Sequence, residues 1–286
     1  MAGSSVEESV NRRQGHVAVG HKGRALVWGG MGSTTEEILI YNSLTQKWTS
    51  RRTTGDIPSE FIYAPATLMD DTVYVYVYSS IWCLDLDTYS WKKLEPIGGP
   101  LRCDSAVCWT YGDKVFLFGG LGPAPTASQV DMLGTLFEFS EHPRYSLPGW
   151  GWSNQLVVFN SVSNRWEWPK YSGQAPSPRA NHSVSVVGNK AYVFGGEGDT
   201  GLMNDLHCLD LVSMKWSLVM PNTEAVDVPV GRWGQTMTPI HTGREEGLLL
   251  YGGVDSNTTV LGDCWRMDLH GLRSILRRVG EKGNRC

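Results

Sequence analysis

The stretch Ala25–Gly30 reads ALVWGG, an apolar run that ends in two glycines. Three further runs of this kind follow along the chain, VFLFGG at 115–120, AYVFGG at 191–196 and LLLYGG at 248–253. A related run, Val73–Tyr76, has the same alternation but carries Val77 and Tyr78 where the others have glycines. Self-similarity of this type indicates a repeat architecture, with the second repeat degenerate and its hairpin shortened.

Each glycine-terminated run lies among other short apolar runs, so every repeat predicts four strands. A first strand is expected ahead of each run, at 16–20, 63–68, 105–111, 182–187 and 235–240. A third strand follows each run, and a turn and a tryptophan then close most repeats, at Trp48, Trp91, Trp166 and Trp216. The long interval between the second and third of these tryptophans contains Leu121–Ser153, which we interpret as an insertion. Without it, the spacing of the repeats is regular.

Composition agrees with an all-β fold and excludes several classes of function. The chain has 33 glycines, 12 tryptophans and only 19% charged residues among 286. A hydrophobic fraction of 41% excludes a disordered chain, and no apolar run is long enough to span a membrane. The net charge of −4 gives no general attraction to nucleic acid or to an anionic membrane.

The polar residues 1–14 contain no apolar core of a secretory signal and are expected to be a flexible N-terminus. Six scattered cysteines without a CxxC pair are typical of reduced thiols in an intracellular protein. The sequence therefore predicts a location in the cytosol or nucleus.

Four-stranded units at this period, with Gly-Gly and Trp at fixed offsets, resemble kelch repeats, which implies a β-propeller over residues 15–269. Five four-stranded blades are recognisable. Either five blades close the ring, or the chain is a truncated form of a six-bladed domain, and we favour truncation. Within residues 270–286, Leu272, Ile275, Leu276 and Val279 have helical spacing and predict a short basic amphipathic helix with a tail.

A more specific resemblance extends over most of the chain. The matching stretches are GHVAV at 15–19, VWGG at 27–30, the residues around 133–139, Gly151-Trp152, SPRA with His182, and MNDLH at 203–207. They resemble the family of kelch domain-containing proteins 1 and 2, substrate receptors of cullin-2 ubiquitin ligases. The resemblance implies capture of a protein's free C-terminus on the propeller face formed by the loops after Gly-Gly and the loops between blades.

In that family two arginines and a serine hold the terminal carboxylate. The corresponding positions here are Glu197, Leu202 and Trp233, and all three depart from the pattern. Trp152 aligns with a tryptophan that lines the family's pocket. Arginines lie in the loops between blades, where they either contact ligand or tie neighbouring blades together, the second being favoured for Arg179 and Arg232. The predicted peptide pocket comprises Arg102, Trp152, Glu197, Arg232 and Trp233.

Receptors of this family end in a helix that binds elongin C. The C-terminal residues resemble that helix, with Gly271 in place of its leucine, Ile275 in place of its cysteine, and Val279 in agreement. The residues expected to contact elongin C are Leu272, Ile275 and Val279. An alternative interpretation is a helix that packs its apolar side on the last blade.

No catalytic or metal-binding signature is present, because the sequence contains no HExxH, GxSxG, phosphate-binding loop or dinucleotide fingerprint. We therefore expect no enzyme, no cofactor and no metal, but a propeller that binds a protein or peptide on its loop-rich face. By resemblance its partners are elongin B, elongin C and cullin-2, with no nucleic acid and no membrane. The alternative is a ligase-independent scaffold or an inactive truncated isoform.

Overall fold

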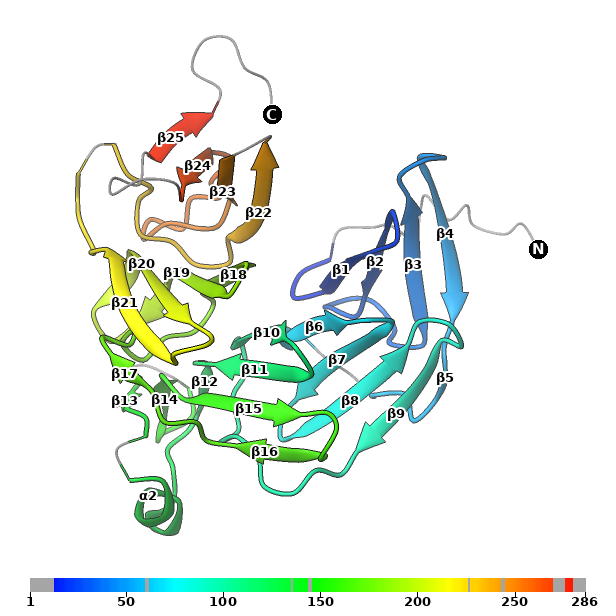
Figure 1. Cartoon of the computed structure of the whole chain (residues 1–286), viewed down its shortest axis with the longest axis horizontal. Coiled ribbons are helices and arrows are strands. Elements are labelled where there is room, and N and C mark those ends of the chain that lie inside the picture. The colour runs from blue at the N-terminus through cyan, green and yellow to red at the C-terminus, as the bar shows by residue number, and fades with distance from the viewer. Residues whose placement is uncertain are drawn as a thin grey trace.

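The computed structural model describes residues 13–59, 62–134, 136–143, 146–225, 227–242, 245–269 and 276–279. It is an all-β structure in which each predicted repeat forms an antiparallel sheet (Figure 1). The described part of the chain contains one helix, which is too short to cross a membrane.

In each of the five repeat sheets the four main strands run in sequence order from an inner to an outer strand, as the repeat pattern predicts. The first sheet consists of β1 (Val17–His21), β2 (Arg24–Trp28), β3 (Glu37–Asn42) and β4 (Lys47–Arg52). The second consists of β6 (Ala66–Met69), β7 (Thr72–Val77), β8 (Ser80–Asp85) and β9 (Ser90–Leu94), with the two-residue β5 (Thr54–Gly55) added outside β9.

The other three sheets repeat this plan. The third consists of β10 (Val107–Tyr111), β11 (Lys114–Phe118), β15 (Leu156–Asn160) and β16 (Arg165–Glu167). The fourth consists of β18 (Ser183–Val187), β19 (Lys190–Gly198), β20 (Gly201–Asp210) and β21 (Lys215–Met220), with β17 (Ser172–Gly173) outside β21. The fifth consists of β22 (Thr236–Thr242), β23 (Glu245–Tyr251), β24 (Cys264–Asp268) and β25 (Leu276–Val279).

The core lies between neighbouring sheets, because the alternating apolar residues of each strand face the next sheet. Four buried clusters join the first sheet to the second, the second to the third, the third to the fourth and the fourth to the fifth. The repeat tryptophans fill these interfaces: the ring of Trp91 lies edge-on to that of Trp28, 6.2 Å away. Trp216 is 1% exposed and packs on Phe118.

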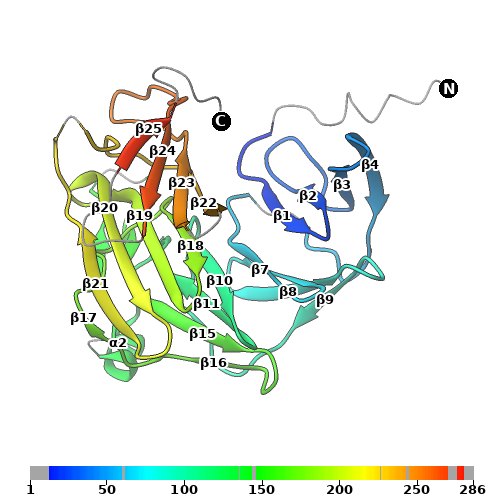
Figure 2. The same cartoon turned by 45° about the horizontal axis from the view of Figure 1, so that its top comes forward.

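The five sheets form an arc with the first and fifth sheets at its two ends (Figures 1 and 2). Among the described residues, no buried cluster and no hydrogen bond joins these two end sheets. The structure therefore agrees with a propeller built of four-stranded blades, and it does not show a closed ring.

The predicted insertion Leu121–Ser153 forms a small unit of its own beside the third sheet. It contains the sheet of β12 (Leu121–Pro123), β14 (Trp150–Ser153) and β13 (Phe139–Glu141), and the helix α2 (Ala127–Leu133). The helix begins with a capping box, in which the Thr126 hydroxyl accepts from the Gln129 backbone and the Gln129 side chain accepts from the Thr126 backbone.

The predicted C-terminal helix is wrong where the structure describes that segment. Residues 276–279 form the strand β25, which pairs antiparallel with β24 and gives the fifth sheet its fourth strand. The spacing of apolar residues is helical, but the open edge of β24 offers backbone hydrogen bonds, and tertiary pairing overrides a local preference in so short a segment. Leu272 and Ile275 lie outside the described residues.

Candidate functional site

The loops after Gly-Gly and the loops between sheets lie at one end of the sheets, because consecutive strands run up and down. We call this end the loop face. Short backbone ladders join the two kinds of loop: Asp104 pairs with Leu121, Ala180 with Glu197, and Trp233 with Val254. The second glycine of each pair makes this close approach possible. A Cβ on Gly196, which has φ 93°, would lie 2.6 Å from the Ala180 carbonyl oxygen.

Arg179 joins the loop before the fourth sheet to the interior of that sheet. Its guanidinium is fully buried and donates to both carboxylate oxygens of Asp205, at 2.7 and 2.9 Å. It also donates to the carbonyl oxygens of Ser177 and Gly195. Burial alone raises the pKa of Asp205, but the hydrogen bonds from Arg179 and His207 outweigh it and hold that pKa well below its usual value.

Arg232 repeats this arrangement one sheet later. It is also fully buried, donates to both oxygens of Asp263 at 2.6 and 2.8 Å, and donates to the carbonyls of Gly252 and Val230. The indole N–H of Trp265 donates to the same carboxylate at 2.7 Å. Arg232 therefore has no exposed surface for a ligand, and its geometry favours the interpretation that such loop arginines tie the blades together.

Arg102, in contrast, is exposed on the loop face. Its guanidinium carbon lies 5.0 Å from the ring centre of Tyr78 and 5.1 Å from that of Trp150. Tyr78, which is 48% exposed, occupies the position of the missing glycine of the second repeat, and Trp150 belongs to the insertion. Two cation–π contacts hold the charge in a fixed place. We call Tyr78, Arg102 and Trp150 the arginine cluster.

Trp152 lies two residues after Trp150 on β14, but it faces the interior of the insertion. It is 4% exposed, and its ring lies 4.4 Å from that of His142. Its backbone pairs with Leu121 and Ser140. Trp152 therefore lies in the same small sheet as Trp150 of the arginine cluster, where its ring is packed rather than presented to solvent.

Glu197 lies at the loop-face end of β19, and Trp233 lies in the loop that leads into the fifth sheet. The Glu197 carboxylate accepts a hydrogen bond from the Asn181 side chain at 2.9 Å, and the Asn181 carbonyl accepts from the backbone N–H of Gly234. Glu197 and Trp233 are both partly exposed. The five predicted pocket residues thus separate into the region of Arg102 and Trp152, the region of Glu197 and Trp233, and the buried Arg232.

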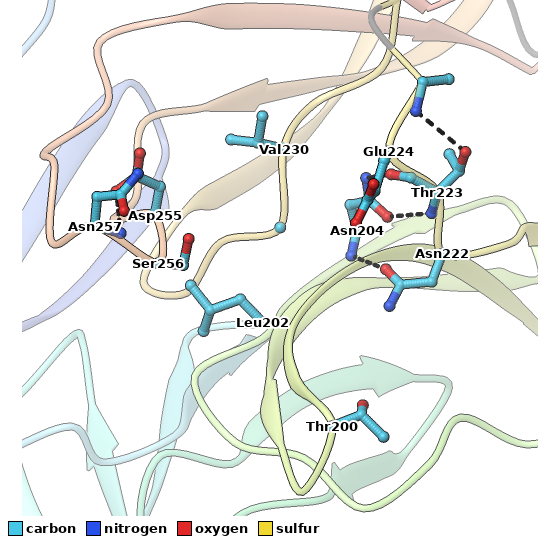
Figure 3. A pocket seen from close by; sticks show the side chains of 12 residues that line it. Thr200, Leu202, Asn204, Asn222, Thr223, Glu224, Val230, Asp255, Ser256 and Asn257 are labelled. Atoms are coloured by element: carbon cyan, nitrogen blue, oxygen red, sulfur yellow. Dashed lines mark hydrogen bonds between the residues drawn. The ribbon is translucent and has the colours of Figure 1, made fainter.

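A cavity of about 690 Å³ opens on the loop face between the fourth and fifth sheets (Figure 3). Leu202, Ala225 and Val230 form its apolar part. The polar part comes from three segments, which supply Thr200, Asn204, Asn222, Thr223, Glu224, Asp255, Ser256 and Asn257. The lining contains two acidic residues and no basic residue.

Asn204 fixes one wall of this cavity. Its side chain donates to the carbonyls of Thr223 and Pro229, at 2.7 and 2.8 Å, and accepts from the Thr223 backbone at 2.9 Å. On the opposite wall, the Asp255 carboxylate accepts from the backbone N–H groups of Asn257 and Thr259. Both loops are therefore held by buried or paired polar groups, and the cavity is shaped before any ligand enters.

The negative charge of this cavity limits the kind of ligand that it can bind. Leu202 stands at a position where the resembling family has a carboxylate-binding arginine, and Glu224 and Asp255 add negative charge. A cavity so lined favours amide, hydroxyl or cationic groups over a free carboxylate. An extended peptide backbone with a Lys or Arg side chain fits this chemistry.

None of the five predicted pocket residues lines this cavity. The run Asp255-Ser256-Asn257 follows the fifth Gly-Gly directly, which is the signal that could have placed it on the loop face. The run Asn222-Thr223-Glu224 lies between two sheets, where the polar composition is ordinary for a loop, so the sequence holds no signal there. At Tyr78 the sequence shows only the departure from glycine, which is no signal of a binding role.

No cluster of His, Cys, Asp and Glu suited to a metal ion occurs among the described residues. The five described cysteines are free thiols. Of the three residues expected to contact elongin C, only Val279 is described, and its backbone pairs with Cys264 in the fifth sheet.

Repeated four-stranded sheets with Gly-Gly loops, stacked through their faces, define this chain as a propeller-type repeat protein. The chain belongs to the kelch-repeat family: residues 148–274 match the KLHDC2/KLHL20/DRC7 Kelch-repeats domain. It is 32% identical to bovine Kelch domain-containing protein 2 over 88% of its length, and 30% identical to human Kelch domain-containing protein 1 over 93%. It is also 25% identical to human Host cell factor 1, of which it covers 16%.

The chain spans about two thirds of the length of the curated relatives that it matches first, 66% of the bovine protein and 68% of the human one. The predicted kelch family is therefore confirmed. Kelch homologues also support the coarser functional prediction, a propeller that binds proteins.

Proposed function

We propose that this kelch protein binds a peptide segment of a partner protein on its loop face. The observation that carries the proposal is the arginine cluster, in which an exposed guanidinium is held between the rings of Tyr78 and Trp150. Aromatic residues and arginine are the residue types that supply most of the binding energy in protein interfaces. The preformed cavity between the fourth and fifth sheets adds a second contact region on the same face.

We further propose that the bound protein is a substrate and that the chain acts as its receptor in a cullin-2 ubiquitin ligase, in the cytosol or nucleus. The support is the resemblance to receptors of that type together with the peptide-binding loop face. Recognition of protein C-termini belongs to this proposal. It requires a carboxylate partner other than the family's arginine positions, and Arg102 is the exposed loop-face cation that suits the role.

The receptor role requires binding to elongin B and elongin C. Co-purification of the full chain with both proteins tests it, with Ile275→Asp as the disrupting variant and Val162→Asp as the matched control. Val162 is 79% exposed in the turn between β15 and β16, at the end opposite the loop face. A stoichiometric complex with wild type and control, lost with Ile275→Asp, is the expected result. A well-folded chain that forms no complex would contradict the receptor role.

The alternative function is a ligase-independent scaffold, and the strand β25 favours it. Residues 276–279 are paired in the fifth sheet, so an elongin-binding helix that includes Val279 can form only if β25 leaves β24. A scaffold binds partner peptides on the loop face without elongin C. The co-purification experiment therefore separates the two functions, while peptide binding is common to both.

A further inference from the structure

Three of the five sheets carry an extra backbone segment along the outer edge of their last strand. In the second sheet β5 pairs in parallel with β9, and in the fourth sheet β17 pairs in parallel with β21. In the third sheet Ile97 forms a parallel bridge with Arg165. In each case the segment comes from the connection that leads into that sheet, so the outer edge is a recurrent docking position in this fold.

The same backbone geometry prepares each of these edges. The residue two positions before the repeat tryptophan has a positive φ, 57° at Tyr89, 51° at Asn164 and 52° at Met214. The carbonyl of that residue accepts a hydrogen bond from the incoming segment in every case. The donors are the backbone N–H groups of Thr54 at 3.0 Å, Ile97 at 3.2 Å and Ser172 at 3.0 Å.

The incoming segments also share a glycine at the next position. Gly55, Gly98 and Gly173 have φ of 83°, 77° and 81°. A Cβ on Gly55 would lie 2.1 Å from the carbonyl oxygen of Trp91, and a Cβ on Gly173 would lie 2.0 Å from that of Trp216. In the second sheet an acidic residue follows: the Asp56 carboxylate accepts from the backbone N–H of Lys93 at 3.2 Å.

The first sheet has the same prepared edge on β4. Gln46, two residues before Trp48, has φ 54°. Among the described residues, no hydrogen bond reaches the carbonyl of Gln46 or the outward backbone groups of Trp48 and Ser50. β4 is accordingly the outermost strand of the first sheet (Figure 1). Within the described part of the chain, no segment occupies at β4 the position that is filled in three other sheets.

The surroundings of this edge are basic. A cavity of about 470 Å³ beside β4 is lined by Arg24, Lys47 and Arg51 and by no acidic residue. Arg51 is held 4.3 Å above the ring centre of Tyr89. Residues 13–55 contain six basic and two acidic residues, a net charge of +4, whereas the whole chain has −4. No salt bridge joins these three lining cations to an acidic residue within the described chain.

We propose that the outer edge of β4 binds an extended, acidic segment of a partner protein in parallel register. Its glycine lies opposite Trp48, as Gly55 lies opposite Trp91, and its backbone N–H groups donate to the carbonyls of Gln46 and Trp48. A carboxylate after the glycine reaches the N–H of Ser50, as Asp56 reaches that of Lys93, and further acidic residues of the segment pair with the cations of the neighbouring cavity. Strand addition of this kind takes affinity from backbone bonds and specificity from side chains. This site is separate from the loop face.

The probe is a fluorescein-labelled peptide, Asp-Glu-Thr-Thr-Gly-Asp-Ile-Pro, in which residues 53–58 of the chain are preceded by two acidic residues. Fluorescence anisotropy with the full chain at low salt measures its affinity. The peptide is expected to bind and to lose binding as salt rises. Replacement of its glycine by alanine is expected to weaken binding at least about tenfold, because the added Cβ meets the Trp48 carbonyl.

Protein variants locate the site. Ser50→Pro removes one outward N–H from an edge strand and should weaken binding about fivefold. Lys47→Glu reverses one charge and should also weaken it about fivefold. The matched control is Lys92→Glu, an exposed lysine on β9 whose outer edge is already occupied by β5. This control should leave the affinity unchanged.

Three results would overturn the proposal. The alanine peptide could bind as tightly as the glycine peptide, or Lys92→Glu could weaken binding as much as Lys47→Glu. The double substitution Glu7→Lys and Glu8→Lys could tighten peptide binding. That result would mean that the first residues of the chain occupy the edge, and it would contradict binding of a partner protein there. Unchanged affinity in that double variant supports the proposal.

Discussion

Arg232 binds Asp263 through both terminal nitrogens of its guanidinium, at 2.6 and 2.8 Å, and the arginine side chain is fully buried while that of Asp263 is 12% exposed. The pair repeats the contact between Arg179 and Asp205 in the preceding sheet. In both cases the arginine comes from the loop that enters the sheet; Asp205 lies on β20, and Asp263 lies directly before β24. These pairs hold the loop face in shape, so the residues beside them can present a fixed surface.

Arg232→Ala is expected to destabilise the protein rather than to change its ligand. The substitution leaves the Asp263 carboxylate, which is only 12% exposed, without its cation, and such a loss lowers the free energy of unfolding by about 3 kcal/mol. Urea unfolding followed by tryptophan fluorescence measures the change. Arg102→Ala, at an exposed arginine, is the control and should lower that free energy by less than about 0.5 kcal/mol. Equal losses in the two variants would refute this assignment.

His182 should make the stability depend on pH. It is buried, and burial lowers its pKa to about 3. Because the unfolded chain binds a proton at this residue below its ordinary pKa of about 6.5 and the folded chain does not, stability falls as the pH drops below that value. From pH 7 to pH 5 the contribution is a loss of about 2 kcal/mol.

The matched variant for this prediction is His182→Gln. Gln235 occupies the same position in the fifth sheet, where its side chain donates to the Phe194 carbonyl at 2.9 Å. A neutral amide at 182 should remove the His182 part of the pH dependence. Urea unfolding of both proteins at pH 5 and pH 7 measures this difference. An equal loss of stability in the variant and the wild type between pH 7 and pH 5 would contradict the prediction.

Gly173→Ala is expected to detach the short strand β17. The new Cβ would meet the Trp216 carbonyl oxygen at 2.0 Å, and the positive φ of 81° would be strained. A loss of about 2 kcal/mol in the free energy of unfolding is expected. Amide hydrogen exchange should show faster exchange at Ser172, whose N–H bonds the Met214 carbonyl. Gly188→Ala, at a glycine with no neighbouring atom within reach of a Cβ, is the control for packing.

Arg102→Ala is expected to weaken binding of a loop-face peptide about tenfold without altering the fold. The substitution removes the charge held between Tyr78 and Trp150. Arg102→Lys separates the two roles of the side chain, because lysine keeps the charge but lacks the planar group that stacks on aromatic rings. An intermediate affinity for the lysine variant is the expected result. Isothermal titration with a selected peptide measures all three proteins.

The repeat pattern predicted the strands well, because Gly-Gly and Trp recur for reasons that are local to each repeat. The predicted first strand 182–187, for example, agrees with β18 at Ser183–Val187. The prediction of a C-terminal helix was wrong because residues 276–279 pair with the edge strand β24. The spacing of apolar residues does not show that such an edge is available. The parallel strands β5 and β17 were also missed, since two residues are too few to produce a periodic signal.

The candidate site was less predictable than the fold. An arginine in a loop between blades can either hold the blades together or contact a ligand, and the sequence does not distinguish these roles. Arg232 is buried and bound to Asp263, whereas Arg102 is exposed and stacks on two aromatic rings. The difference arises because Arg232 has a partner aspartate, Asp263, which lies 31 residues further along the chain. The cavity residues lie in loops whose polar composition is common, so only the three-dimensional arrangement shows that they converge.

Peptide selection on the full chain tests the central claim most directly. Peptides taken from a random display library would be measured by isothermal titration against wild type, Arg102→Ala, Leu202→Asp and the control Val162→Asp at the opposite end of the sheets. The account predicts that at least one loop-face variant weakens binding about tenfold or more and that Val162→Asp does not. Peptides whose affinity is the same for all four proteins would contradict a binding site on the loop face.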